Sequence, residues 1–188
     1  MRLHGTVRTD RPLLVVALDE EARQLDGVLP VLITGVGKVR AAVSVAALLA
    51  GERPASVVNL GTAGGLRHGL DGIHEVGTVV QHDFDDESVA AVVGHHFGGP
   101  LTLGTGPTLA TGDRFVAGGP VRDALARHAD LVDMEGYAVA AACLAAGVPV
   151  RLVKLVSDDA DDDAGRTWAE SVADHAHTLA AWATEHLT

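Results

Sequence analysis

Short apolar runs alternate with alanine-rich segments from one end of the chain to the other. The apolar runs predict strands, and the alanine-rich segments carry apolar residues at helical spacing. Strands separated by helices need crossover connections, so this alternation predicts a largely parallel sheet in an α/β layered fold. The expected strands are residues 13–18, 31–34, 56–60, 76–81, 108–111, 131–134 and 150–156. The expected helices are residues 20–25, 38–50, 120–128, 136–146 and 167–187.

The chain is long enough to bury one hydrophobic core, since 47% of its 188 residues are hydrophobic. We therefore expect a single domain over residues 13–188, preceded by a poorly ordered N-terminal extension at residues 1–12. Lys and Arg number 14 against 25 Asp and Glu, which gives a formal net charge of −11. This charge repels phosphate backbones and anionic lipids, so neither nucleic acid nor a membrane is an expected partner.

The single cysteine, Cys143, lies in an alanine-rich apolar run. It cannot form an intrachain disulfide and is expected to be a small core residue in a reducing compartment. The N-terminus lacks the apolar stretch of a signal peptide, and no uncharged apolar run reaches the roughly 18 residues that a membrane-spanning helix needs. These features predict a cytoplasmic protein.

Carboxylates and glycines cluster directly after the expected strands. In an open α/β sheet the carboxyl ends of the strands form the crevice that binds ligands. Acids come directly after three expected strands that are far apart in the sequence: Glu20 or Glu21, Glu135, and Asp158. Carboxylates that converge without a metal suit general acid–base catalysis and the stabilisation of an oxocarbenium-like cation. The alternative is that each acid only caps a helix or lies in its first turn.

Two glycine-rich turns, "TGVGKV" at residues 34–39 and "GTAGGL" at residues 61–66, follow strands. Their backbones can approach a ligand closely and point N–H groups at it. The first turn lacks the third glycine of a dinucleotide fingerprint, and the second lacks the lysine and hydroxyl residue of a phosphate-binding loop, so tight turns without a ligand remain the alternative. The turns contribute these substrate-binding candidates: Val36, Thr62, Ala63 and Gly64.

Two acidic or histidine-rich stretches raise the question of a metal. Asp159, Asp161, Asp163 and Glu170 have the spacing of a calcium loop, but Ala164 stands where that loop needs glycine. The second stretch has no recognised metal-ligand spacing; it contains His82, Asp83, Asp85, His95 and His96. Solvated loop residues are the simpler interpretation of both stretches, and we expect no metal and no cofactor.

Seven motifs occur in an order and context that resemble the purine nucleoside phosphorylase-like superfamily, and most of all its hydrolytic branch, the 5′-methylthioadenosine/S-adenosylhomocysteine nucleosidases. The motifs are "ALDEEARQL", "TGVGKVRAA", "VNLGTAGGL", "HDFD", "TGDRF", "VDMEGYAVAAAC" and "VSDDAD". The resemblance covers residues 13–187. It implies a twisted mixed central sheet flanked by helices in three layers, a homodimer, and an activity in methionine salvage.

The resemblance also implies roles for individual residues. Glu21 matches the acid that activates the attacking water, and Asp158 matches the general acid that protonates the purine N7, with Ser157 beside it. Glu135 matches the carboxylate that accepts hydrogen bonds from the ribose hydroxyls, and Met134 matches the residue packed under the sugar.

Three further positions match the part of the family's pocket that holds the base. Phe115 resembles the ring that stacks on the purine, and Val116 the residue whose backbone hydrogen-bonds to it. Trp168 aligns with an aromatic side chain that closes the pocket.

The resemblance implies an enzyme that cleaves the N-glycosidic bond of a purine nucleoside, with 5′-methylthioadenosine or S-adenosylhomocysteine as substrate. Cleavage builds positive charge on the sugar, which suits a proton donor at the base and anionic groups near the ribose. The acidic residues "DEE" directly after the first expected strand would repel phosphate, so hydrolysis is favoured over phosphorolysis. The segment between "HDFDD" and "TLAT" is shorter than in the family, which leaves futalosine and other 5′-modified nucleosides open. A nucleoside-binding module without turnover is the alternative from another class.

Overall fold

A mixed β-sheet forms the centre of the computed structural model, which describes residues 1–161 and 164–188, the side chains of residues 166–172 excepted. The described part of the chain contributes ten strands to this sheet. They are β1 Arg2–His4, β2 Pro12–Val16, β3 Val31–Ile33, β4 Ser56–Gly65, β5 Ile73–Glu75, β6 Thr78–Gln81, β7 Leu101–Thr102, β8 Thr108–Thr111, β9 Leu131–Asp133 and β10 Val150–Asp158.

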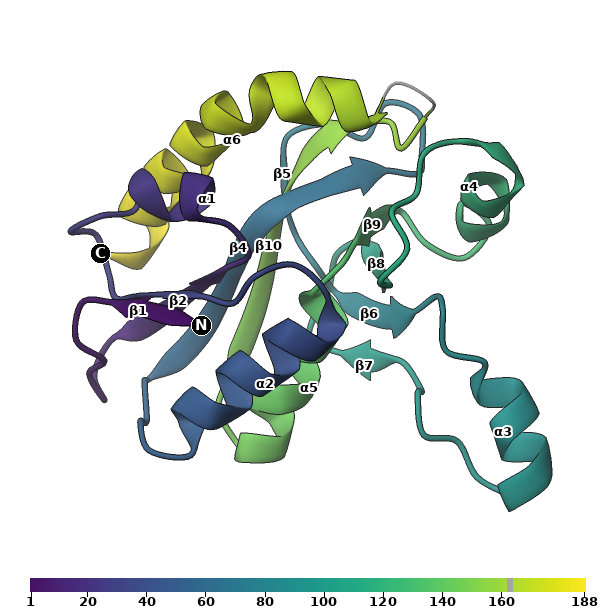
Figure 1. Cartoon of the computed structure of the whole chain (residues 1–188), viewed down its shortest axis with the longest axis horizontal. Helices are drawn as coiled ribbons and strands as arrows, with labels where there is room; N and C mark the ends of the chain where they lie inside the picture. Colours follow the sequence, from purple (N-terminus) through teal and green to yellow (C-terminus); the bar gives the residue numbers. More distant parts are fainter. Residues whose placement is uncertain (162–163) are drawn as a thin grey trace.

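The long strand β4 is the branch point of the sheet (Figure 1). Along most of its length β4 pairs in parallel with β10, and its first half also pairs in parallel with β2. At Gly64 and Gly65 it turns to an antiparallel partner, β9. Strands β9, β8, β6 and β7 then continue the sheet in that order. The carboxyl ends of β4 and β10 therefore lie together beside the short strand β9.

Helices cover both faces of the sheet. They are α1 Asp19–Arg23, α2 Lys38–Leu49, α3 Asp86–Val93, α4 Gly119–Leu125, α5 Gly136–Ala146 and α6 Ala164–Leu187. Helix α1 packs against α6 on one face, and α2 packs against α5 on the other (Figure 1). The expected fold class, a mixed sheet flanked by helices in three layers, is confirmed.

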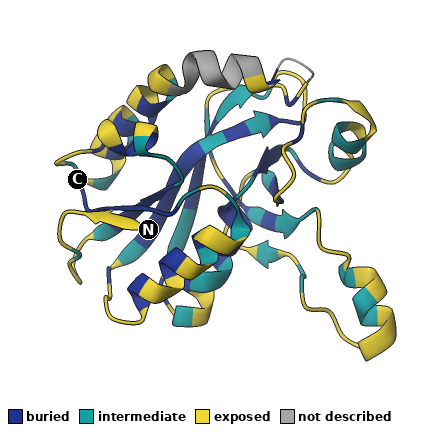
Figure 2. Ribbon diagram, viewed as in Figure 1, coloured by how far each residue is buried: buried dark blue, intermediate teal, exposed yellow. Residues whose placement is uncertain are grey.

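The alternation of side chains along β2 explains the two core layers. Leu13 and Val15 belong to the apolar cluster under α2 and α5, whereas Leu14 and Val16 belong to the cluster under α1 and α6. Successive residues of a strand point to opposite faces, so a strand covered on both sides must be continuously apolar. The blue interior of the sheet in Figure 2 shows this burial.

Helix α3 is the exception to this packing. None of its residues is buried, and Figure 1 shows it standing away from the body of the protein. Among the described residues, no helix is both long and apolar enough to cross a membrane.

The observed elements differ from the expected ones mainly where they are short. Strands β1, β5 and β7 were not expected, because two or three residues are too few to show a periodicity. Strand β1 lies within residues 1–12 and pairs antiparallel with β3. Strand β4 was expected to end at Leu60 but continues to Gly65, since its glycines and Thr62 still pair with β10.

Candidate active site

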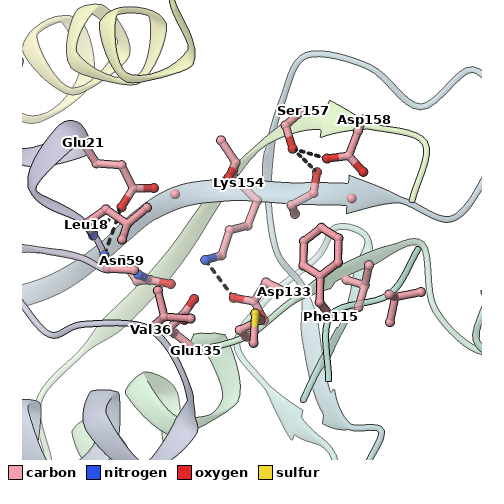
Figure 3. Close-up of a pocket in the computed structure, with 18 of the residues that line it drawn as sticks. Leu18, Glu21, Val36, Asn59, Phe115, Asp133, Glu135, Lys154, Ser157 and Asp158 are labelled. Carbon is pink, nitrogen blue, oxygen red and sulfur yellow. Dashed lines mark hydrogen bonds and ion pairs between the residues drawn. The ribbon is translucent and has the colours of Figure 1, made fainter. Parts of the chain in front are cut away.

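A cavity of about 280 Å³ opens at the carboxyl ends of β4, β9 and β10 (Figure 3). The start of α1 and the turn before α2 complete its wall. In Figure 3, Glu21 and Asp158 lie on opposite sides of the Lys154 side chain, and Phe115 stands near Asp158. The cavity thus occupies the edge of the sheet where an α/β fold binds its ligands.

Glu21 lies at the side of the cavity formed by α1 and is buried. Its Oε2 atom accepts hydrogen bonds from the backbone N–H groups of Ala17 and Leu18, each at 3.0 Å. Burial raises the pKa of Glu21 above its ordinary value of 4.5, although these N–H groups and the charge of Lys154 lower it. Glu21 is therefore a first-turn acid that satisfies helix N–H groups, as the structural alternative predicts, but only one of its two oxygens is used for this.

The other oxygen of Glu21, Oε1, lies beside Gly61, where the backbone of Thr62 also hydrogen-bonds to Glu21 and lowers its pKa. A Cβ atom at Gly61 would lie 3.5 Å from Oε1 of Glu21 and 3.4 Å from Nζ of Lys154. Because glycine has no Cβ, this space stays free between a carboxylate and an ammonium. Such a space suits a small polar molecule that can donate to one group and accept from the other.

Glu135 occupies the N-cap position of α5, but its side chain does not cap that helix. Instead, Oε1 accepts a hydrogen bond of 2.7 Å from the backbone N–H of Gly37, at the start of α2. Burial and the neighbouring charge of Asp133 raise the pKa of Glu135 from 4.5 to about 7. Glu135 therefore does not cap α5 with its side chain; its carboxylate accepts from the N-terminus of α2 instead and forms part of the cavity wall.

Asp158 ends β10 at the opposite side of the cavity. Ser157 donates its hydroxyl to Oδ2 of Asp158 at 2.7 Å, and the backbone N–H of Ala160 donates to Oδ1 at 2.9 Å. Ala160 has a positive φ of 51°, which is uncommon for a residue other than glycine. Two hydrogen bonds and a tight turn thus hold the Asp158 carboxyl group in place at the end of its strand.

The part of the cavity near Asp158 offers an aromatic surface. The Phe115 side chain lines the cavity and is 52% exposed, whereas Val116 beside it is buried. A Cβ atom on Gly165, at the start of α6, would lie 3.8 Å from the Phe115 ring. A half-exposed ring at the mouth of a cavity provides a face on which a planar base can stack.

The structure brings almost all of the sequence-predicted site residues into this one cavity. The predicted residues that line it are Glu21, Val36, Thr62, Ala63, Gly64, Phe115, Val116, Met134, Glu135, Ser157 and Asp158. The side chain of Trp168 lies outside the described residues, as do Asp163 and the side chain of Glu170 from the calcium-loop spacing. Within the described part of the chain, no group of three or more His, Cys, Asp or Glu side chains is arranged to hold a metal ion.

Sequence reasoning missed the buried lysine of this site. Lys154 is only 1% exposed, and its Nζ atom forms an ion pair of 2.9 Å with Asp133. Burial alone would lower the pKa of Lys154, but the charges of Asp133 and Glu135 outweigh this effect and raise it. Lys154 lies inside β10, whereas the acids of the site were predicted from their positions directly after expected strands. A lone lysine between apolar neighbours, in "LVKLV", was the available signal.

The fold and the cavity define a class of α/β proteins that bind a small ligand at the carboxyl edge of the sheet. Comparisons with known proteins narrow that class. Residues 82–188 match the phosphorylase superfamily. The 5′-methylthioadenosine/S-adenosylhomocysteine nucleosidase of Actinobacillus succinogenes is 32% identical over 169 aligned residues, which cover 73% of this chain and 70% of that protein. The chain belongs to the phosphorylase superfamily, as the motifs indicated.

Solved structures agree with this fold. The S-adenosylhomocysteine nucleosidase of Streptococcus pyogenes, in complex with 5-methylthiotubericidin, superposes with a TM-score of 0.80 at 24% identity, over 98% of this chain and 100% of the other. The futalosine hydrolase of Helicobacter pylori superposes with a TM-score of 0.77 at 20% identity, over 93% and 95%. The shared fold therefore does not distinguish an S-adenosylhomocysteine nucleosidase from a futalosine hydrolase.

Proposed function

We propose that the protein is a nucleosidase, which hydrolyses the N-glycosidic bond of a purine nucleoside and releases the free base and the sugar. The observation that carries this proposal is the convergence of Glu21, Glu135 and Asp158, from three distant segments, on one cavity. The similarity to 5′-methylthioadenosine/S-adenosylhomocysteine nucleosidases supports 5′-methylthioadenosine or S-adenosylhomocysteine as the substrate.

The positions of the three acids suit the steps of this hydrolysis. As the bond between C1′ and N9 breaks, its electrons move into the purine, and Asp158 donates a proton to N7. Positive charge builds on the ribose, where Glu135 accepts from the sugar hydroxyls and stabilises the cation. A water oxygen then bonds to C1′ and loses its proton to Glu21.

The remaining lining residues position the substrate in this scheme. Phe115 stacks on the purine and Val116 hydrogen-bonds to it through its backbone, while Met134 packs under the sugar. Ser157 orients Asp158 through the 2.7 Å hydrogen bond between them. Trp168 is proposed to close the pocket by analogy with the family.

Water is the proposed nucleophile instead of phosphate. The nucleophile would be held beside Gly61, where Oε1 of Glu21 lies 3.5 Å from the position a Cβ atom of residue 61 would take. A carboxylate at this distance repels a phosphate anion in a poorly solvated cavity, but it accepts a proton from water.

We also propose that the protein is a homodimer. Helix α2 exposes Val39 and Val43, which are 72% and 63% exposed and lie one turn apart, and Leu144 is exposed on the neighbouring helix α5. Apolar side chains that gather on one face of a protein indicate an interaction surface.

The experiment that tests the activity is chromatographic detection of free base and free sugar, with and without phosphate. The protein is incubated with 5′-methylthioadenosine, S-adenosylhomocysteine, futalosine, adenosine and inosine. Release of base without phosphate is the expected result, and the substrate released fastest identifies the 5′ substituent. Release only with phosphate would make the protein a phosphorylase, and no release from any of the five would contradict the proposal.

A further inference from the structure

The cavity wall contains a buried cluster of four ionisable groups, here called the charge cluster: Glu21, Asp133, Glu135 and Lys154. All four residues are at most 9% exposed. Three carboxylates face a single ammonium, and removing charges from water is costly unless they are paired and hydrogen-bonded. The position of the ammonium among the carboxylates therefore determines the electrostatic potential of the cavity.

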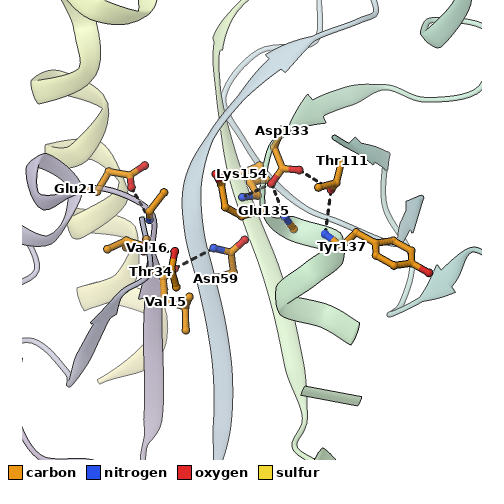
Figure 4. Close-up of polar contacts among 12 residues, drawn as sticks. Val15, Val16, Glu21, Thr34, Asn59, Thr111, Asp133, Glu135, Tyr137 and Lys154 are labelled. Atoms are coloured by element: carbon orange, nitrogen blue, oxygen red, sulfur yellow. Dashed lines mark hydrogen bonds and ion pairs between the residues drawn. The ribbon is translucent and has the colours of Figure 1, made fainter. Parts of the chain in front are cut away.

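Three donors from different elements hold the two oxygens of Asp133 (Figure 4). Its Oδ1 atom accepts from the hydroxyl of Thr111 at 2.6 Å. Its Oδ2 atom accepts from the backbone N–H of Gly136 at 2.8 Å and from Nζ of Lys154 at 2.9 Å. The Asp133 side chain is 1% exposed. With both oxygens engaged and almost no exposed surface, Asp133 is not oriented to bind the substrate itself.

The Lys154 ammonium poses a problem for the reaction proposed above. A positive charge in the wall of a cavity opposes the formation of a ribosyl cation, and this opposition is strong where water is excluded. Asp133 is the last residue of β9 and holds the ammonium in an ion pair, with 2% of the Lys154 side chain exposed. An ion pair presents a much weaker field to the ribose than an unpaired ammonium does.

We propose that Asp133 is a positioning residue of the nucleosidase: it anchors the Lys154 ammonium and cancels its charge, so that the cavity wall facing the ribose remains anionic. This inference rests on the proposed function, because it assigns Asp133 a purpose only if a cation forms at the sugar. The inference gives Asp133 a different role from Glu135, which lies two residues further along the chain and faces the ribose directly.

Thr111 fixes the geometry of this arrangement. Its hydroxyl donates to Asp133 and accepts from the backbone N–H of Tyr137 at 3.0 Å, so it connects β8, β9 and the first turn of α5 (Figure 4). Thr111 is completely buried. The Asp133 carboxylate is therefore held by three elements of the fold and cannot turn toward the substrate without breaking these bonds.

The first test compares ligand affinities of the wild type and Asp133→Asn by calorimetry. One ligand is a 5′-methylthio nucleoside analogue with a protonated pyrrolidine in place of ribose, and the other is the neutral, hydrolysis-resistant 5′-methylthiotubercidin. We expect the variant to lose about tenfold more affinity for the cationic ligand than for the neutral one. A purely structural role would weaken both equally, and equal losses, or no loss, would overturn the proposal.

A matched control is an acid that pairs with another cation of β10, the strand that carries Lys154. Glu75 forms an ion pair of 2.8 Å with Arg151 of β10, outside the cavity. Glu75→Gln makes the same chemical change as Asp133→Asn. It is expected to change neither the affinities nor their ratio.

The second test does not depend on the enzyme's activity. The Glu135 carboxyl group is followed by ¹³C NMR as the pH is varied, with Glu135→Gln used for assignment. The charged groups around it are Asp133, Lys154 and Glu21, and His82 lies near Asp133. Removing the Asp133 charge frees Lys154 to pair with Glu135, so the titration midpoint should move to lower pH by about one pH unit. An unmoved midpoint would contradict the proposed coupling.

A milder pair of variants keeps the proposal testable if Asp133→Asn does not fold. Thr111→Val removes the hydroxyl that donates to Asp133, and Thr111→Ser restores it. We expect a smaller loss of preference for the cationic ligand in the first variant and recovery in the second. If the wild type releases no base and binds neither ligand, the proposed function fails, whereas the NMR titration still supports or contradicts the coupling within the charge cluster.

Discussion

The carboxylate of Glu135 accepts a hydrogen bond of 2.7 Å from the backbone N–H of Gly37, which lies 98 residues earlier in the chain. Gly37 is the N-cap of α2 and has φ 100° and ψ 155°, a conformation that is almost restricted to glycine. This N–H, at the positive end of the helix dipole, favours the ionised carboxylate and partly offsets the cost of its burial. The glycine-rich turn thus orients a carboxylate of the cavity.

We predict that Gly37→Ala destabilises the protein and weakens nucleoside binding. The alanine Cβ would lie 3.0 Å from Oδ1 of Asp113 in addition to the unfavourable φ, so the free energy of unfolding should fall by about 1–3 kcal/mol. Gly27→Ala is the control, because Gly27 has φ 78° but no atom near its Cβ position. Urea unfolding and calorimetric titration should show lower stability in both variants and weaker binding only in Gly37→Ala.

Asp158→Asn should abolish release of the base without unfolding the protein. The asparagine amide is too weak an acid to transfer a proton to N7, so kcat should fall by about 10²–10⁴-fold. Its oxygen can still accept from the Ala160 N–H, and its NH2 can donate to Ser157, whose hydroxyl then donates to the Ala63 carbonyl, which keeps the local structure. Asp159→Asn changes the exposed neighbour and should retain wild-type kcat. Near-normal turnover by Asp158→Asn would remove Asp158 from its assigned role.

Gly61→Ala should block hydrolysis but not nucleoside binding. Its methyl group would fill the space between Glu21 and Lys154 at 3.4–3.5 Å from both, a distance of ordinary contact that the fold tolerates. We expect a loss of kcat of at least about tenfold with little change in affinity for 5′-methylthiotubercidin. Gly51→Ala, where no atom lies near the added Cβ, is the control. Equal turnover in the two variants would show that the attacking water lies elsewhere.

Glu135→Gln should make the protein more stable at pH 8 while it lowers activity. Glu135 has a pKa of about 7 in the folded protein and an ordinary value of 4.5, so its contribution to stability is complete below pH 4.5 and is lost as the pH rises through 7. Glutamine stays neutral and can still accept from Gly37. The gain in the free energy of unfolding should be small at pH 5 and about 2–3 kcal/mol at pH 8.

Urea unfolding at both pH values measures this effect. Glu20→Gln, at an exposed position of α1, should follow the wild type at each pH. A constant difference between Glu135→Gln and the wild type would mean that Glu135 does not bind its proton more tightly on folding.

Val43→Glu should dissociate the proposed homodimer. A charge in the centre of the exposed apolar face of α2 would be buried without a partner on association. Sedimentation velocity at micromolar concentration should show a dimer for the wild type and a monomer for the variant. His177→Glu adds a negative charge at an exposed position of α6 and should remain dimeric. A monomeric wild type would contradict the proposal.

Much of the fold could be predicted from the sequence, because its elements carry local signals. Helix α5 has its expected bounds, since Gly147, with φ 66°, ends it where the apolar run stops. Helix α3 was missed because its eight residues give only a short pattern, although Val89, Val92 and Val93 have helical spacing and Asp85 and Gly94 are recognisable cap residues.

The site could be predicted only in part. Glu21, Glu135 and Asp158 follow strands, and the topology of an α/β sheet predicts that strand ends meet. The ion pair of Lys154 with Asp133 depends on the pairing of β10 and β9 with β4, which no local pattern specifies. The resemblance supplied the roles of the residues, and the structure supplied the reason that a lysine is tolerated inside the core.

Helix α3 contributes no buried side chain to the protein. Residues that support nothing beneath them can be inserted, deleted or replaced without cost to the core. The segment between β6 and β7 is therefore where related chains can diverge fastest. The acids that line the cavity, Glu21, Glu135 and Asp158, are by contrast kept in place by packing. Evolution can in this way change this outlying segment independently of the chemistry inside the cavity, and a designer who grafts loops onto this scaffold has the same freedom.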